Sequence, residues 1–251
     1  MKMGVYALSK IFVVGIGPGE YEQMTIRAVN ALQSCDVIVG YTVYVDLVKE
    51  HFAEKEFLTT PMRREVERCR MAFEEAKKGR SVAMICSGDA GVYGMAGLML
   101  EIGQEYPDIP VEVIPGVTAA LGGGAVLGAP LIHDFCLISL SDLLTPWEKI
   151  EKRLLAAAEA DFVVCLYNPS SKKRHDYLEK ACDLMMRYKS PETVCGIVSN
   201  IGREGETGRV MSLKELRDTR VDMFTTVFVG NSQTTAIDGK MVTPRGYRKG
   251  N

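Results

Sequence analysis

Three glycine-rich loops carry the residues of this chain that are best suited to bind a small molecule. They are Val13–Gly19 (Val-Val-Gly-Ile-Gly-Pro-Gly), Ser87–Gly94 (Ser-Gly-Asp-Ala-Gly-Val-Tyr-Gly) and Val113–Thr118 (Val-Ile-Pro-Gly-Val-Thr). Each loop contains or follows an apolar run that is typical of a β-strand. Open α/β sheets bind ligands outside the carboxyl ends of their strands, so the three loops together predict one small-molecule site.

The first loop departs from the fingerprint of a dinucleotide-binding fold. Its Pro18 lacks a backbone N–H that could face a pyrophosphate, and Glu20 would place a carboxylate beside it. Asp36 begins the second predicted strand, whereas the residue that grips a ribose should end it. These departures disfavour an NAD-dependent oxidoreductase, and a phosphate loop ending in Gly-Lys-Ser/Thr is absent as well.

A cationic cofactor without phosphates suits the loops better, and S-adenosylmethionine is such a molecule. Gly88 and the other glycines of its loop allow the main chain to approach a ligand closely, and Asp89 can accept from an ammonium group or a ribose hydroxyl. Thr118 and Ala119 supply a hydroxyl and a small surface at the start of a predicted helix. The alternative is that each glycine only makes a turn.

His133 and Asp134 are the preferred candidates for proton transfer, because histidine titrates near neutrality and this pair opens the second half of the chain. Tyr41 and Asp46, after the second predicted strand, are the runners-up. For His133 the alternative is a structural role, with its ring bonded to a nearby backbone carbonyl.

Arg63 and Arg64 begin the densest basic run of the chain. Arginines hold carboxylates bidentately, so these two residues are the candidates for contact with an anionic substrate. Glu65 and Glu67 lie in the same run, and the alternative is a surface helix whose charges neutralise one another.

Strands alternate with helices along the chain, which predicts an α/β fold with parallel βαβ units. The expected strands are Lys10–Val14, Asp36–Val39, Val82–Cys86, Val111–Ile114, Phe135–Leu140, Phe162–Tyr167, Val194–Ser199 and Thr225–Val229. The expected helices are Thr25–Ser34, Arg63–Lys78, Met95–Tyr106, Thr145–Ala160, Ser171–Tyr188 and a short one after Ser212. The glycine run 122–124 predicts two domains, 1–122 and 123–251, and the residues after Asn231 are expected to form a loose tail.

Composition limits the possible partners. The formal net charge is −2, so we expect no nucleic-acid partner. The N-terminus lacks a secretory signal, and the uncharged stretch Val113–Ile132 contains turn residues typical of a core rather than of a membrane span. The seven cysteines include no Cys-x-x-Cys pair. We therefore expect a cytoplasmic protein with reduced thiols, no metal site and no membrane contact.

Four motifs in this order resemble those of the tetrapyrrole (corrin/porphyrin) methylases. They are Val14–Gly19, Ser87–Gly94, Ile114–Ala119 and Val164–Pro169, and the resemblance covers about residues 10–235. Three further stretches resemble the precorrin-3B C-17 methyltransferase branch of cobalamin biosynthesis: Gly40–Asp46, Arg63–Cys69 and Gly128–Leu144.

The resemblance implies a homodimer of two-domain chains, each domain an αβα layer structure, with S-adenosylmethionine in the cleft between the domains. The cofactor residues it implies are Pro18, Gly88, Asp89, Val92, Thr118, Ala119, Leu166, Tyr167, Gly230 and Asn231. The implied reaction is methylation of a precorrin-3B-type tetrapyrrole at C-17, coupled to contraction of the ring. Whether the substrate contains cobalt stays open, as do a sister methylase acting at another ring carbon and a non-catalytic nucleotide sensor.

Overall fold

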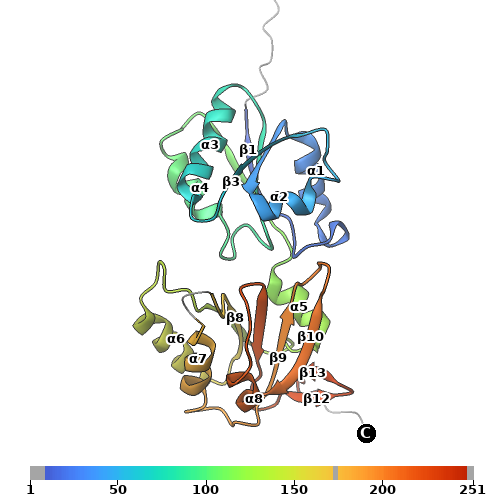
Figure 1. Cartoon of the computed structure of the whole chain (residues 1–251), viewed down its shortest axis with the longest axis vertical. Coiled ribbons are helices and arrows are strands. Elements are labelled where there is room, and N and C mark those ends of the chain that lie inside the picture. The colour runs from blue at the N-terminus through green and yellow to red at the C-terminus, as the bar shows by residue number, and fades with distance from the viewer. Residues whose placement is uncertain (1–8, 172–174, 248–251) are drawn as a thin grey trace, which may run out of the picture. The chain divides into compact units, whose positions relative to one another are not determined.

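The computed structural model describes residues 9–171 and 175–247 (Figure 1). The chain divides into two compact units between Thr118 and Ala119; they are called unit 1 and unit 2 below. The boundary expected between residues 122 and 123 falls within helix α5 (Ala119–Leu127) of unit 2, because the glycine run is helical and does not interrupt the chain.

Unit 1 is built on a parallel sheet with the strand order β3-β2-β4-β1-β5. The strands are β1 (Ile11–Gly15), β2 (Val37–Tyr41), β3 (Glu56–Thr60), β4 (Val82–Cys86) and β5 (Val111–Ile114). Central strand β4 is buried throughout, as expected of a parallel strand that is covered on both faces. All five strands end at one edge, which we call the carboxyl edge of unit 1. Strand β3 was not expected from the sequence.

Helices cover both faces of this sheet. They are α1 (Ile26–Ser34), α2 (Thr42–Val48), α3 (Glu65–Lys77) and α4 (Ala96–Gly103), with a 3₁₀ turn at Tyr21–Gln23. One apolar cluster joins α1 and α2 to the sheet, and another joins α3 and α4. Thr25 caps α1 by accepting from the Ala28 amide at 3.1 Å. Helix α3 begins two residues later than expected, because Arg63 has a left-handed backbone (φ 67°).

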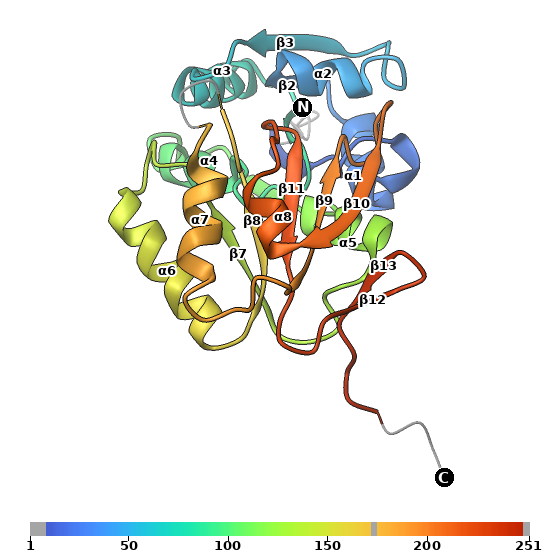
Figure 2. The same cartoon turned by 60° about the horizontal axis from the view of Figure 1, so that its bottom comes forward.

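Unit 2 contains a mixed sheet with the order β10-β9-β11-β8-β7 (Figure 2). The strands are β7 (Phe135–Ser139), β8 (Val163–Tyr167), β9 (Val194–Ser199), β10 (Thr207–Ser212) and β11 (Thr225–Val229). Strands β7 and β8 are parallel, whereas β11 is antiparallel to both β8 and β9. Strands β7, β8 and β9 therefore end at the edge where β11 begins, and we call this the carboxyl edge of unit 2. The opposite edge is its amino edge.

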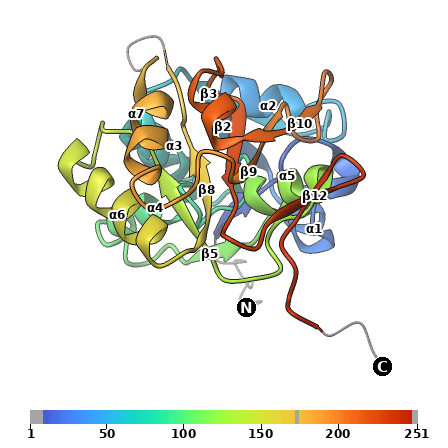
Figure 3. The same cartoon turned by 90° about the horizontal axis from the view of Figure 1, so that it is seen from below.

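Helix α5 covers one face of this sheet, and α6 and α7 cover the other (Figure 3). The bounds are α6 (Trp147–Glu159), α7 (Tyr177–Met185) and the short α8 (Leu213–Arg217). The expected capping box forms at α8, where Ser212 and Glu215 bond reciprocally. The one expected at Thr145–Glu148 does not form, because Pro146 occupies the N-cap position. Helix α7 is shorter than expected, and residues 172–174 of the expected helix lie outside the described residues.

The expected loose tail is partly ordered. Strands β12 (Thr235–Ile237) and β13 (Lys240–Val242) form a hairpin, and β13 pairs with β6 (Gly128–Ala129). Asp238 and Gly239 both have positive φ, as a two-residue hairpin turn requires. Among the residues that the structure describes, no helix is both long and apolar enough to cross a membrane.

Candidate functional site

The three glycine loops meet at the carboxyl edge of unit 1, where they pack against one another through their main chains. Gly17 and Gly88 form an antiparallel bridge, with N–H to carbonyl distances of 3.0 and 2.7 Å. A Cβ atom on Gly116 would lie 2.2 Å from the Gly88 oxygen and 2.5 Å from the Gly15 oxygen. These three loops touch only because glycines occupy the contact points. Pro18 follows Gly17 directly and is thereby held at the same edge.

Asp89 holds the second and third loops together with its carboxylate. Its Oδ1 accepts from the amides of Gly91 and Val92 at 2.8 and 3.1 Å, and its Oδ2 accepts from the Gly116 amide at 2.9 Å. The carboxylate is thus fixed in place by three backbone donors. Carboxylate oxygens have lone pairs beyond these bonds, so Asp89 can still accept from a ligand.

Two neighbouring features shape the rim of these loops. Thr25 Oγ1 donates to the Pro115 carbonyl at 3.2 Å, which fastens the third loop to the start of α1. Tyr93, exposed after Val92 in the second loop, has a left-handed backbone with φ 55°. Such a conformation is uncommon for an aromatic residue and marks this turn as held by its surroundings. Thr118 ends the third loop and is the last residue of unit 1.

The other half of the same edge carries Tyr41 and residues 61–64 between β3 and α3, which are called the arginine loop below. Tyr41 is the last residue of β2, and its ring meets that of Tyr44 edge to face at 5.2 Å. Asp46 lies further along α2, exposed and paired with Lys49 at 2.7 Å. Arg63 and Arg64 follow β3 and are exposed.

The charges of the arginine loop are only partly neutralised. Arg64 pairs with Glu67 at 3.1 Å, and Glu65 accepts from the Arg63 amide at 3.2 Å. Both arginines lie beyond the end of β3 at the carboxyl edge of unit 1, and the pairing of Arg64 with Glu67 is weak because both side chains are exposed.

In unit 2, the end of β8 carries Leu166 and Tyr167, two of the residues that the resemblance implies for cofactor contact. Leu166 is fully buried in the core, whereas the Tyr167 hydroxyl accepts from the Ala120 amide at 2.8 Å. Tyr167 thereby holds the first turn of α5, which begins at Ala119. The next residue, Asn168, has a left-handed backbone and donates to Ser139 Oγ at 2.9 Å. Asn168 belongs to the motif Val164–Pro169 and Ser139 to the stretch Gly128–Leu144, but neither was a candidate site residue, although an Asn-Pro pair directly after a strand is a turn signal.

His133 and Asp134 lie at the other edge of this sheet. They precede β7, and the Asp134 carbonyl accepts from the Val163 amide at the start of β8. Tyr167 lies four residues after Val163 along β8, so the two residues are about 13 Å apart at roughly 3.3 Å per residue. His133 Nδ1 accepts from the Asp134 amide at 3.0 Å, and the Asp134 side chain is exposed. Unit 2 therefore does not bring this pair to the Tyr167 end of the sheet, and its catalytic role stays a prediction.

Gly230 and Asn231 lie at the amino edge as well, because β11 runs antiparallel to β8. Val229 pairs with Val164, and the Gly230 amide donates to the Val194 carbonyl at 2.9 Å. Asn231 is 5% exposed and its Oδ1 accepts from the Gln233 amide. These two residues are not close to Leu166 and Tyr167, and their role in cofactor binding stays a prediction.

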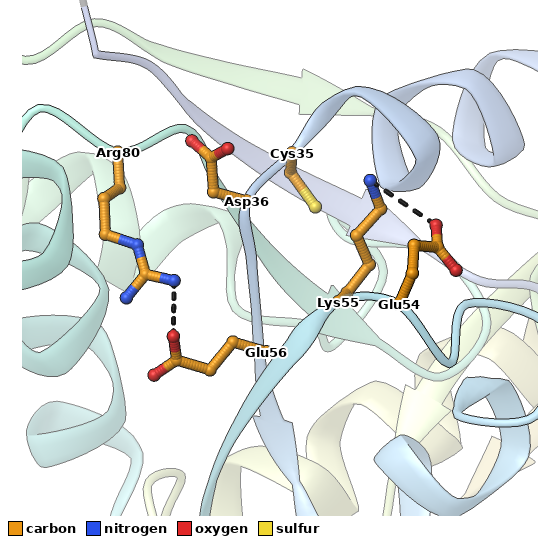
Figure 4. A pocket seen from close by; sticks show the side chains of 6 residues that line it. All are labelled: Cys35, Asp36, Glu54, Lys55, Glu56 and Arg80. Atoms are coloured by element: carbon orange, nitrogen blue, oxygen red, sulfur yellow. Dashed lines mark hydrogen bonds and ion pairs between the residues drawn. The ribbon is translucent and has the colours of Figure 1, made fainter.

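The amino edge of unit 1 contains a hollow of 540 Å³ lined by charged residues (Figure 4). It is lined by Cys35, Asp36, Glu54, Lys55, Glu56 and Arg80. Arg80 pairs with Glu56, and Asp36 accepts from the Ser81 amide at 2.8 Å. Burial raises the pKa of the Cys35 thiol to about 11, so it is not a nucleophile at neutral pH. These groups satisfy one another, and the hollow does not supply a second candidate site.

Comparison of the sequence with known proteins identifies its family and close relatives. The model of the tetrapyrrole (corrin/porphyrin) methylases matches residues 10–217. A probable cobalt-factor III C(17)-methyltransferase of Salmonella typhimurium is 50% identical over 236 residues, which cover 94% of this chain and 98% of that protein. A cobalt-factor III methyltransferase of Priestia megaterium is 45% identical over 245 residues, which cover 96% of this chain and 45% of that protein.

A solved structure gives the same result for the fold. The crystal structure of the methyltransferase CobJ matches with a TM-score of 0.86 and 34% identity, and the match covers 94% of this chain and 100% of that one. The family match spans both units and includes the glycine loops of unit 1 and the end of β8 in unit 2. The chain belongs to the tetrapyrrole (corrin/porphyrin) methylases.

Proposed function

We propose that this protein transfers a methyl group from S-adenosylmethionine to C-17 of a precorrin-3B-type tetrapyrrole, with cobalt-factor III as the substrate, in cobalamin biosynthesis. In the proposed reaction, methylation is coupled to contraction of the ring. The observation that carries it is the 50% identity to the Salmonella protein over nearly the full length of both chains. The arginine loop and the glycine loops both lie within the matched region and support the proposal.

The residues of the glycine loops fit S-adenosylmethionine better than a phosphorylated cofactor. The carboxylate of Asp89, which ties the second loop to the third, would repel phosphate and attract an ammonium or a hydroxyl. A Cβ on Gly91 would meet only Asp89 Oδ1, at 3.3 Å, so the main chain is open on that side. We propose that Gly88, Asp89 and Val92 hold the methionine and ribose parts, with Pro18 and Thr118 beside them.

In unit 2 we propose that Ala119, Leu166 and Tyr167 contribute to the cofactor site. The cofactor supplies a methyl group that is already activated by a sulfonium, so the protein's main tasks are to align the ring carbon and to exclude water. The fixed Tyr167 hydroxyl at the start of α5 is suited to positioning rather than to chemistry.

Among the candidates for proton transfer, Tyr41 is the one that we propose acts on the substrate. It ends β2 at the carboxyl edge of unit 1, the edge that also carries Arg63 and Arg64. Arg63 and Arg64 would bind peripheral carboxylates of the tetrapyrrole there. Asp46 is paired with Lys49 on α2, which leaves it less free to move protons.

The test is to incubate the purified protein with S-adenosylmethionine and either cobalt-factor III or metal-free precorrin-3B, without oxygen. We expect mass spectrometry to show one added methyl group on cobalt-factor III, and fragmentation to place it at C-17. A reaction without S-adenosylmethionine is the control. Methylation at another ring carbon would show a sister methylase, and tight cofactor binding without turnover on either substrate would favour a sensor.

We also propose that the protein is a cytoplasmic homodimer that binds neither nucleic acid nor membranes. The net charge of −2 gives no overall attraction to polyanions. Light scattering of the purified chain should give about twice the mass of one chain.

A further inference from the structure

Arg68 is a buried arginine at the carboxyl edge of unit 1. It lies in the first turn of α3, and only 5% of its surface is exposed. Its Nε donates to Thr60 Oγ1 at 2.8 Å, and its Nη2 donates to the Pro61 carbonyl at 3.1 Å. The guanidinium also lies 5.8 Å from the centre of the Tyr41 ring. Since Thr60 ends β3 and Tyr41 ends β2, the charge is held where these two strands end.

No carboxylate of the described chain lies within ion-pair distance of this guanidinium. Its neighbours on α3 differ: Arg64 pairs with Glu67, and Arg70 makes a two-pronged pair with Glu105 at 2.7 and 2.9 Å. Both bonds of Arg68 go to neutral oxygens, and its Nη1 has no hydrogen-bond partner among the residues that the structure describes. Arg64 and Arg70 are thus each paired with a carboxylate, whereas the buried Arg68 is not paired with any carboxylate of the described residues.

The positive charge of Arg68 acts on the thiol pKa of two nearby cysteines, Cys69 and Cys86. Burial raises the pKa of the Cys69 thiol to about 12, and Arg68 is the main group that opposes this rise. Burial likewise raises the pKa of Cys86 to about 11, with Arg68 among the groups that oppose it. Cys86 ends β4, so the positive charge acts at the ends of three neighbouring strands, β3, β2 and β4.

A buried charge without a counter-ion is costly, and proteins normally pair it. We propose that Arg68 binds a carboxylate of a ligand at the carboxyl edge, with Nη1 as the donor that faces it. This inference rests on the proposed function insofar as both ligands of that reaction carry carboxylates. One source is a side-chain carboxylate of the tetrapyrrole, and the other is the methionine carboxylate of the cofactor.

The geometry favours the tetrapyrrole, and not the cofactor, as the ligand whose carboxylate binds Arg68. Arg68 anchors Pro61, and the loop that starts there continues through Arg63 and Arg64. A carboxylate at Arg68 would therefore be bound beside two further guanidinium groups that are exposed on the same loop. The glycine loops follow β4, β1 and β5, on the other half of the sheet.

The test compares the full-length protein with Arg68→Gln and with the control Arg70→Gln, which removes an exposed arginine of the same helix. Three probes are titrated by calorimetry or fluorescence: uroporphyrin III, S-adenosylhomocysteine and methylthioadenosine, which lacks the amino-acid carboxylate. We expect Arg68→Gln to weaken uroporphyrin III binding about 10- to 100-fold, as loss of a charged hydrogen bond implies, and to leave both nucleosides within threefold. Arg70→Gln should change none of the three.

A different pattern would identify the other source. If Arg68→Gln weakens S-adenosylhomocysteine but not methylthioadenosine, the bound carboxylate is that of the cofactor, and the carboxylate site itself stands. If Arg68→Gln binds all three probes normally and only melts earlier, Arg68 merely pins the loop and the proposal is overturned.

Two further measurements keep the outcome unambiguous. Should Arg68→Gln fail to fold, Arg68→Lys takes its place: it retains the charge without the planar fork, and uroporphyrin III binding should weaken several-fold. Unchanged binding in a folded Arg68→Lys whose Tm is lowered would count against a carboxylate bound by Nη1 of the guanidinium. Turnover of cobalt-factor III by the unaltered protein is measured in parallel. Its absence would refute the proposed function and not the carboxylate site, because no probe requires turnover.

Discussion

Replacing Asp89 should damage unit 1 itself as well as ligand binding. Asp89 was selected from the sequence as a ligand-binding carboxylate, but its oxygens also accept three backbone amides from two loops. Asp89→Ala removes all three bonds. Asp89→Asn keeps an oxygen for Gly91 and Val92 but turns an amide N–H₂ toward the Gly116 N–H, so it selectively breaks the link between the loops.

The magnitudes follow from the exposure of the three donors. The Val92 and Gly116 amides are partly buried, and each lost bond should cost about 1–1.5 kcal/mol, whereas water can replace the bond of the exposed Gly91 amide at about 0.5 kcal/mol. Asp89→Ala should therefore lower the free energy of unfolding of unit 1 by about 3 kcal/mol. Asp89→Asn should lower it by about 1–2 kcal/mol.

The assay must separate the two units, because a chain with two units need not unfold in one step. The single tryptophan, Trp147, lies in unit 2, where its ring packs against Tyr177 at 4.5 Å. Urea unfolding followed by tryptophan fluorescence therefore reports on unit 2 and serves as an internal control. Hydrogen exchange measured on peptides of residues 87–94 and 113–118 reports on the loops of unit 1.

We expect faster exchange in both peptides for Asp89→Ala, faster exchange mainly in 113–118 for Asp89→Asn, and an unchanged fluorescence transition for both. Calorimetry should show weaker S-adenosylhomocysteine binding in each variant. If exchange in both peptides is unaltered and only the affinity falls, the carboxylate serves the ligand alone and the reasoning from its three bonds is refuted.

Three other predictions test separate parts of the structure. Gly116→Ala should destabilise unit 1 by more than about 3 kcal/mol in urea unfolding, because its Cβ would overlap two carbonyl oxygens. The control Gly97→Ala, in α4, should stabilise unit 1 by about 0.5–1 kcal/mol, because its Cβ would have nothing within 4 Å. Equal effects of the two variants would contradict the close packing of the loops. Burial tends to raise the pKa of Asp161, but hydrogen bonds from Ser232 together with the charge and hydrogen bond of Lys189 outweigh it and hold the pKa below its ordinary 3.8. Unit 2 should therefore lose stability as the pH falls below about 3.8, and Asp161→Asn should flatten this acid limb of the tryptophan fluorescence transition; an unchanged limb would assign it to other carboxylates. His133→Ala should keep the single-turnover rate within a few-fold while Tyr41→Phe lowers it about 10²-fold, and the reverse order would return the proton-transfer role to His133.

The glycine loops could be placed at one edge from the sequence because each follows a strongly apolar strand in a βαβ pattern. Parallel strands put their carboxyl ends together, so no knowledge of the strand order was needed. The function of the glycines was harder to predict. Gly15 and Gly116 give the loops room to touch each other, and a sequence pattern cannot distinguish this from room for a ligand.

The arginine loop was predicted less well, for a local reason. Strand β3 reads Glu-Phe-Leu-Thr-Thr, half exposed at the edge of the sheet, and it lacks the apolar run that identifies a buried strand. Without β3 the basic run appeared to be a continuous helix. In the structure Arg63 ends a turn with a left-handed backbone, and Arg68, which the sequence does not distinguish from its neighbours, is the buried arginine of the run.

Strand direction accounts for the site residues of unit 2 that the structure does not bring together. The resemblance implies Gly230 and Asn231, which directly follow Thr225–Val229, as cofactor residues, and the bounds of this strand are as expected. Because β11 is antiparallel, its beginning and not its end lies at the carboxyl edge, where Thr225 bonds to Ser199 at 2.9 Å. Periodicity determines which residues form a strand but carries no information on its direction, which depends on long-range pairing. A ligand site composed of strand ends therefore depends on strand directions that only the folded chain shows, and Gly230 and Asn231 lie at the amino edge for that reason.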